Sequence, residues 1–126
     1  MGKSPQWIRL QRADGTALPV RVRYCATFGS RLRGLTFRRQ LDPDTALLLV
    51  EARDGRANTA IHMFFVFFPI AAIWINDAGE VVDKRLALPF RPYYAAQAPA
   101  RYVLEGDPQL LDMVEVGETL YLVPEA

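Results

Sequence analysis

The sequence has little of what most often identifies an enzyme. It contains one cysteine and one histidine in 126 residues, so it can form neither an intramolecular disulfide framework nor a structural zinc site. It also lacks a phosphate-cradling glycine loop, a Gly-x-Ser-x-Gly nucleophile elbow and a paired-cysteine motif. These absences exclude most enzyme classes that a sequence reveals, and we expect no catalytic residues, no cofactor and no bound metal.

Charge of one sign and long apolar runs are missing as well. Fifteen Lys+Arg stand against 14 Asp+Glu, so no overall field favours nucleic acid or a membrane surface as partner. The longest apolar stretch, residues 61–75, contains His62 and Pro69 and is shorter than the roughly 20 residues that a membrane span needs. No signal-peptide pattern precedes it. We therefore expect a cytoplasmic protein with a reduced thiol, without a membrane or nucleic-acid partner.

The chain does have enough apolar material for a core. Hydrophobic residues make up 51% of the sequence and charged residues 23%, a balance typical of globular proteins. A chain of this length fits one domain, residues 1–126, in which we expect residues 1–6 to be flexible. Either a monomer or a homodimer agrees with this composition.

Alternation of apolar and polar residues predicts most of the strands. Residues 7–11 and 18–25 alternate with period two around the turn dipeptide Asp14-Gly15, the pattern of a β-hairpin. One face of the second strand would carry Leu18, Val20, Val22 and Tyr24, and the other Arg21, Arg23 and Cys25. Further strand-like runs, of which 59–68 and 70–75 are expected to be buried, cover residues 45–51, 59–68, 70–75, 81–86, 101–105 and 120–123.

Two short helices complete the expected fold. Residues 27–41 would form a helix interrupted by Gly34, and Asp107 followed by Pro108 has the capping and first-turn residues of another. Residues 88–99 would form an extended loop. About eight strands and two short helices, without a βαβ rhythm, predict a mostly β, β-rich α+β fold: a compact antiparallel sheet or a partly closed barrel.

The order of several short motifs resembles that of a known family. They are Arg31-x-x-Gly34-Leu35 with Arg38 and Leu41, then Ile61-His62-Met63, Phe68-Pro69-Ile70, Asp77-x-Gly79-x-Val81-Val82, and Tyr102-x-Leu104-Glu105 followed by Gly117-Glu118. By this order and spacing, residues 20–123 resemble DUF192, a domain family of bacteria and archaea. The resemblance implies a compact β-rich domain and no established catalytic residue, cofactor or substrate. The family commonly has an aspartate after the Pro-Ile pair, where this chain has Ala71, so a role that needs this carboxylate is not carried over.

The single histidine and the single cysteine each have a structural and a chemical interpretation. Histidine is the side chain whose ordinary pKa lies nearest neutral pH, but Ile61 and Met63 beside His62 favour a packed, hydrogen-bonded residue over a base. Cys25 would need an electropositive, partly exposed setting to act as a nucleophile, with His62 as a conceivable partner. Its place within a strand favours a small buried hydrophobe.

Positive charge is concentrated in the first half of the chain. Residues 1–63 have a net charge of +6 and residues 64–126 a net charge of −5. Six arginines lie between Arg21 and Arg39, and guanidinium groups bind phosphate and carboxylate bidentately. The favoured interpretation is that the basic half neutralises the acidic half across the fold, or lines a solvated face. Glu105, at the end of an apolar strand, could pair with one of these arginines.

These observations favour a small non-catalytic binding or accessory protein. Its ligand would be a small anion, held by residues that include Arg31, Arg38, His62, Tyr93 and Glu105. One alternative is a hydrolase-like enzyme that uses His62 with Cys25 or Glu105. Another is a polyanion- or RNA-binding module on the surface between Arg21 and Arg39, although such modules usually have a net basic charge.

Overall fold

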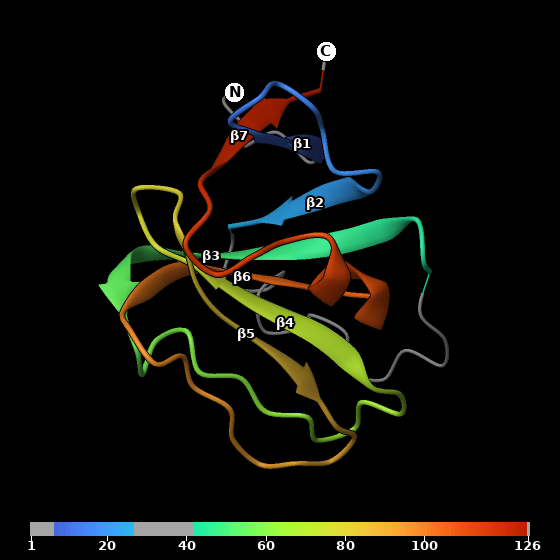
Figure 1. Ribbon diagram of the computed structural model, residues 1–126. Helices are drawn as coiled ribbons and strands as arrows, with labels where there is room; N and C mark the ends of the chain where they lie inside the picture. Colours follow the sequence, from blue (N-terminus) through green and yellow to red (C-terminus); the bar gives the residue numbers. More distant parts are fainter. Residues whose placement is uncertain (1–6, 27–41, 126) are drawn as a thin grey trace, which may run out of the picture.

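The structure is built on a seven-stranded sheet with one short helical turn. In the computed structural model, residues 7–26 and 42–125 are described. The elements are β1 (Trp7–Arg12), β2 (Arg21–Cys25), β3 (Thr45–Gly55), β4 (Ile70–Ile75), β5 (Val81–Ala87), β6 (Ala100–Gly106), the 3-10 helix η1 (Pro108–Asp112) and β7 (Leu120–Pro124). The strands lie side by side in the order β5-β4-β6-β3-β2-β1-β7 (Figure 1). The mostly β class expected from the sequence is confirmed.

One pair of neighbouring strands runs parallel, so the sheet is mixed rather than antiparallel throughout. In that pair, Arg21 of β2 lies opposite Thr45 of β3. A parallel pair needs a crossover of about a dozen residues or more, and residues 26–44 supply it. The helix expected at 27–41 belongs to this connection and lies outside the described residues. The flexible segment expected at 1–6 also lies outside the described residues.

The largest correction concerns residues 59–68, which the sequence predicts to be a buried strand. They form a loop whose one bridge pairs Ile61 with Tyr94. Phe65 has a φ of 60°, in the left-handed region that interrupts a strand. Phe64 and Phe65 are both exposed although they are sequence neighbours, whereas a strand alternates its two faces. An unbroken apolar run has no periodicity to show which side faces out, so the sequence pattern was misleading here.

The first and last strands in the sheet order meet at one corner, while the rest of the sheet stays open. Val81 of β5 donates a backbone hydrogen bond to Glu118 (2.9 Å) and accepts one from Gly117 (2.7 Å), and Leu120 of β7 donates to Gly79 (2.8 Å). Gly79 has a φ of 89°, and a Cβ there would lie 2.6 Å from the carbonyl oxygen of Leu120. The corner therefore requires glycine at this position.

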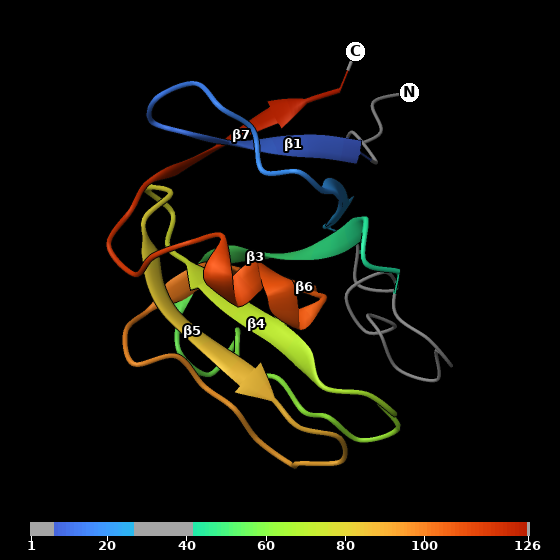
Figure 2. The ribbon, with the colours of Figure 1, turned by 45° about the vertical axis from the view of Figure 1, so that its right-hand side comes forward.

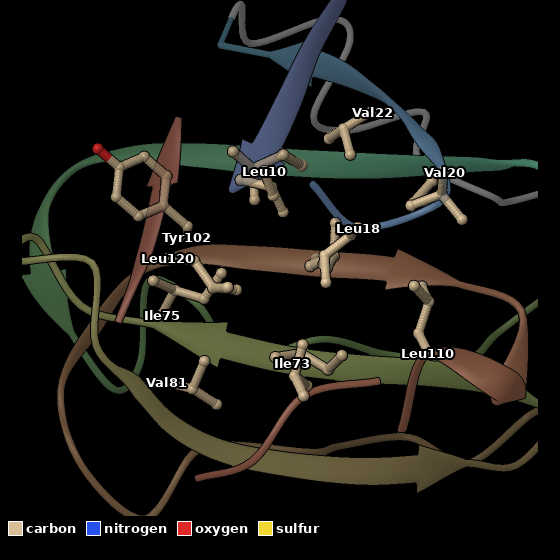
Figure 3. Packing of buried hydrophobic residues seen from close by; sticks show 14 of the residues in the cluster. Leu10, Leu18, Val20, Val22, Ile73, Ile75, Val81, Tyr102, Leu110 and Leu120 are labelled. Carbon is tan, nitrogen blue, oxygen red and sulfur yellow. The ribbon is translucent and has the colours of Figure 1, made fainter. Parts of the chain in front are cut away.

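Apolar side chains pack on both faces of the sheet. The first cluster includes Leu10, Leu18, Val22, Ile73, Leu110 and Leu120 (Figure 3). The second cluster includes Cys25, Met63, Val66, Trp74 and Val103. In β2, Val22 and Tyr24 pack in the first cluster and Cys25 in the second, while Arg21 and Arg23 are exposed; in β6, Tyr102 and Leu104 alternate with Val103 between the clusters. The faces expected for the second strand of the hairpin are thus confirmed.

The short helix expected after Asp107 is present as η1. The Asp107 carboxylate accepts a hydrogen bond from the N–H of Gln109 at 2.9 Å, the contact that an N-cap residue makes. At the other end, Lys84 of β5 donates to the carbonyls of Leu111 (2.6 Å) and Val114 (2.8 Å). These contacts fix η1 over β4 and β5.

Candidate functional site

Two loops that are far apart in sequence are joined at one end of the molecule. They are the β3–β4 loop, residues 56–69, and the β5–β6 loop, residues 88–99. Ile61 and Tyr94 exchange two backbone hydrogen bonds of 2.8 and 2.9 Å. The N–H of Met63 donates to the carbonyl of Arg91, and its carbonyl accepts from the N–H of Phe90. Figures 1 and 2 both show the two loops side by side at the end of the molecule away from the chain termini.

The inner side of this loop pair is anchored to the sheet. Ile61, Met63 and Val66 are buried in the second cluster. The indole N–H of Trp74 in β4 donates to the carbonyl of Thr59 at 2.8 Å. The side chain of Arg56 donates to the carbonyl of Ala96 at 2.8 Å, which adds a bond between the loops. The backbone of both loops is therefore held in place, and their outward side chains are presented from a fixed base.

The outer side of the loop pair is aromatic. Its exposed side chains are His62, Phe64, Phe65, Phe67, Phe90, Arg91 and Tyr93, and this surface is called the aromatic loop end below. The four phenylalanines are each 45–51% exposed. The ring of Phe90 lies 6.0 Å from that of Phe65 and 5.6 Å from that of Phe67, centre to centre, so the patch is continuous across the two loops.

Two residues of this patch have a backbone conformation that side chains rarely adopt. Phe65 has a φ of 60° and Phe90 a φ of 62°. For a bulky residue this conformation costs on the order of 1–3 kcal/mol, and it is concentrated at binding and catalytic sites. Sequence reasoning missed this patch because it assigned the phenylalanines of residues 64–68 to a buried strand.

The structure brings together two of the residues that the sequence proposed for a ligand. The bridge between Ile61 and Tyr94 sets their neighbours His62 and Tyr93 opposite each other, and both side chains are exposed. The expectation of a packed histidine in an apolar strand was wrong. The Nδ1 atom of His62 accepts a hydrogen bond from the N–H of Phe64 at 3.2 Å, so in the neutral ring the proton is on Nε2.

The other proposed residues lie elsewhere. Arg31 and Arg38 fall outside the described residues. Glu105 is in β6, where it pairs with Leu47 of β3 and Ala72 of β4, and it is 6% exposed. Burial raises the pKa of Glu105 to about 7. Within ranges 7–26 and 42–125, no hydrogen bond or ion pair to its carboxylate is found.

Two arginines share the sheet row of Glu105. Arg23 pairs with Leu47 and Arg85 pairs with Ala72, so the row reads Arg23, Leu47, Glu105, Ala72, Arg85 across five strands. Arg23 and Arg85 are each two strands away from Glu105, so their backbones lie about 10 Å from the backbone of Glu105. Arg85 lies 3.7 Å from Asp83. The carboxyl group of Glu105 therefore sits in an apolar position between two cations that are not in direct contact with it.

The geometry does not assemble the residues of the hydrolase-like alternative. Cys25 is buried in the second cluster, and its thiol lies 3.6 Å from the carbonyl of Arg23. The side chain of His62 is exposed, whereas its sequence neighbours Ile61 and Met63 are buried in that cluster. In the part of the chain that the structure describes, no group of three or more His, Cys, Asp and Glu side chains could hold a metal ion.

The described part of the basic half contacts the acidic half, as expected. Arg21 lies over the ring of Trp7 at 4.0 Å and forms an ion pair with Glu125 at 3.1 Å. Arg9 also approaches Glu125, at 3.6 Å, and Arg12 approaches Glu118, at 3.9 Å. These pairs lie along β1, β2 and β7. They leave less free positive charge at Arg21 for a polyanion.

The fold and the order of its motifs define a β-sheet domain with two joined loops at one end. A family model for DUF192, described as Uncharacterized ACR, matches residues 9–121. A UPF0127 protein of Thermococcus kodakarensis is 35% identical over 109 residues, which cover 86% of this chain and 68% of that protein. A UPF0127 protein of Pyrococcus furiosus is 33% identical over 113 residues, covering 88% and 94%. The chain belongs to the DUF192 family.

Two solved structures have a similar fold. A Sinorhizobium meliloti protein, described as a proposed transcription regulator, has a TM-score of 0.79 at 22% identity and covers 97% of this chain and 96% of its own. A protein of unknown function from Novosphingobium aromaticivorans has a TM-score of 0.77 at 18% identity, covering 91% and 83%. At these identities the likeness shows the fold alone.

Proposed function

We propose that this protein is a non-catalytic binding domain that recognises an anionic group at the aromatic loop end. The observation that carries the proposal is that the exposed residues His62 and Tyr93 lie opposite each other on two joined loops, and that the exposed Arg91, whose carbonyl accepts from Met63, lies at the same junction. A guanidinium group forms paired, charge-assisted hydrogen bonds with carboxylate or phosphate. The Nε2–H of His62 and the hydroxyl of Tyr93 add further hydrogen-bond donors.

The charge of the surroundings supports an anionic ligand. The two loops, residues 56–69 and 88–99, contain Arg56 and Arg91 and no aspartate or glutamate. No carboxylate on either loop can therefore neutralise Arg91 or repel an incoming anion. This local bias is independent of the net charge of the whole chain, which is only +1.

Binding without turnover agrees with the placement of the groups that catalysis would use. The Nδ1 atom of His62 is engaged by the backbone of its own loop. Cys25 and Glu105 belong to the other side of that loop, within the sheet. A general base must be within hydrogen-bond reach of the proton that it removes, and these three groups do not converge on one point.

A thermal-shift screen against soluble carboxylates, phosphates and nucleotides tests the proposal. We expect at least one class of anion to stabilise the protein, and we expect Arg91→Gln to remove that stabilisation. The matched control is Arg53→Gln, which removes an exposed arginine of β3 outside the aromatic loop end. Equal stabilisation of both variants, or none by any anion, would refute the proposed site.

A further inference from the structure

We infer that the anionic partner of the aromatic loop end is a membrane surface rich in acidic phospholipids, with the exposed phenylalanines entering the interfacial layer. This inference rests on the proposed function and specifies its partner. It departs from the sequence expectation of no membrane partner, which rested on the absence of a spanning segment and of a strong net charge. Within the described ranges, no helix is long and apolar enough to cross a membrane. The contact that we infer is a peripheral one.

The first argument is the arrangement of the apolar side chains. Phe64, Phe65, Phe67 and Phe90 lie on two adjoining loops, with each ring about half exposed. Leu86 and Leu88, at the end of β5 and just after it, are 47% and 37% exposed. Scattered exposed hydrophobic residues are ordinary, whereas a continuous patch indicates an interaction surface. Aromatic side chains are also favoured at the boundary between lipid and water.

The second argument is the position of the patch. The two loops lie at the end of the molecule opposite the chain termini in both views (Figures 1 and 2). A broad, flat partner can reach this end without meeting β1 or β7. The buried Met63 and Val66 and the bond from Trp74 fix the loops from behind, so little ordering cost remains when the rings enter the interface.

The third argument is charge complementarity. Arg91 lies between Phe90 and Tyr93 in sequence, and neither loop carries a carboxylate. The stem of an arginine can pack among apolar groups while its guanidinium reaches the headgroup layer. Acidic lipids attract basic side chains near the surface, whereas a purely neutral bilayer does not.

The charge of Arg91 opposes two other occupants of the patch. A second copy of the chain, docked through the same surface about a twofold axis, would bring two Arg91 side chains into one apolar interface to which neither loop contributes a carboxylate. Residues 27–41 of the same chain contain four arginines and no carboxylate, so they too would bring like charge. An anionic, apolar surface is the partner that suits both features.

Vesicle co-sedimentation tests the inference. The full-length protein is mixed with sucrose-loaded vesicles of phosphatidylcholine alone, or of phosphatidylcholine and phosphatidylglycerol in equal parts. We expect binding to the acidic vesicles only. In the double variant Phe64→Ser, Phe67→Ser, we expect affinity to fall by about tenfold, because two half-exposed rings no longer leave water.

Matched variants separate the contributions. Val116→Ser and Tyr121→Ser remove exposed apolar side chains outside the aromatic loop end, and we expect them to bind as the unmodified protein does. Arg91→Gln changes one exposed charge, and its thermal unfolding is compared with that of the unmodified protein to verify folding. We expect this variant to lose its preference for acidic vesicles.

Several outcomes would overturn the inference. They are no sedimentation with acidic vesicles, equal sedimentation with neutral ones, or equal loss of binding in the control variants. A dimer that the double variant converts to a monomer, together with no vesicle binding, would assign the patch to a second copy. Stabilisation by soluble anions without vesicle binding would overturn the membrane inference and leave the proposed function standing.

Discussion

The indole N–H of Trp74 donates to the backbone carbonyl of Thr59 at 2.8 Å, and both residues are buried. This bond joins β4, near its C-terminal end, to the loop that carries His62 and the phenylalanines. It satisfies a carbonyl that the sheet ladder does not use. The bond from Trp74 thus adds to the backbone bonds of Ile61 and Met63 that hold the aromatic loop end.

Replacing Trp74 with phenylalanine should destabilise the fold by about 2–4 kcal/mol, because it leaves the Thr59 carbonyl unpaired and removes part of a buried ring. Urea unfolding measures the change. Trp7→Phe is the control, since Trp7 is only half-buried against Arg21, and its cost should be about 1 kcal/mol or less. Equal costs for the two variants would contradict the anchoring role of Trp74.

The buried carboxyl of Glu105 should make stability depend on pH. Its pKa in the folded protein, about 7, lies above its ordinary value of 4.5, so folding favours the protonated form. The stabilisation is fully present below pH 4.5 and is lost as the pH rises through 7, an effect of about 3 kcal/mol. Glu105→Gln should remove this dependence and be more stable than the unmodified protein at pH 8.

Urea unfolding of both proteins at pH 5 and pH 8 gives the comparison. The prediction would be contradicted if the free energy of unfolding rose from pH 5 to pH 8 in the unmodified protein more than in the glutamine variant. It would also indicate a cation that holds Glu105 ionised, such as an arginine of residues 27–41. The same measurement thus examines the ion pair that the sequence suggested.

Glycine at the corner of the sheet should be far less replaceable than glycine in the hairpin turn. Gly79 and Gly15 have nearly the same φ, 89° and 90°. A Cβ at Gly79 meets the carbonyl oxygen of Leu120 at 2.6 Å, whereas a Cβ at Gly15 meets nothing within 4 Å. Gly15→Ala should cost about 1 kcal/mol, and Gly79→Ala should cost clearly more in thermal unfolding. A smaller cost at Gly79 would show that the corner opens easily.

Arg31 and Arg38 are the ligand residues that the sequence proposed and that lie outside the described residues. If they share the anion with the aromatic loop end, Arg31→Ala and Arg38→Ala should each weaken binding by about tenfold, the loss of one charge-assisted hydrogen bond. Isothermal titration with the anion found by the thermal-shift screen measures the affinity. Unchanged affinity in both variants would remove these arginines from the site.

Local pattern predicted the parts of the fold that local chemistry determines. The alternation in residues 18–25 and the turn at Gly15 predicted the two faces of β2 correctly, and Asp107 predicted the start of η1. The parallel pairing of β2 and β3 could not be predicted, because parallel and antiparallel strands share the same alternation. The crossover that makes the pair parallel depends on contacts distant in sequence.

The candidate site was predicted only in part, for a related reason. His62 and Tyr93 were singled out separately, but their meeting depends on the bridge between Ile61 and Tyr94, a long-range contact with no local signal. The phenylalanines were assigned to the core because hydrophobicity predicts burial in most cases. Phe64, Phe65 and Phe67 are exposed instead, and Phe65 has a backbone conformation that departs from what its residue type prefers.

The corner between Gly79 and Leu120 also affects the order of events during synthesis. β7 pairs with β1 and bonds to the turn before β5, so the N-terminal strand cannot complete its pairing until the C-terminal strand has been made. When the chain has left the ribosome only as far as β6, β1 still lacks its partner β7, and the turn before β5 lacks its bonds to residues 117–120. We expect the nascent chain to resist protease only after β7 emerges, since pairings across the full length of a chain form late.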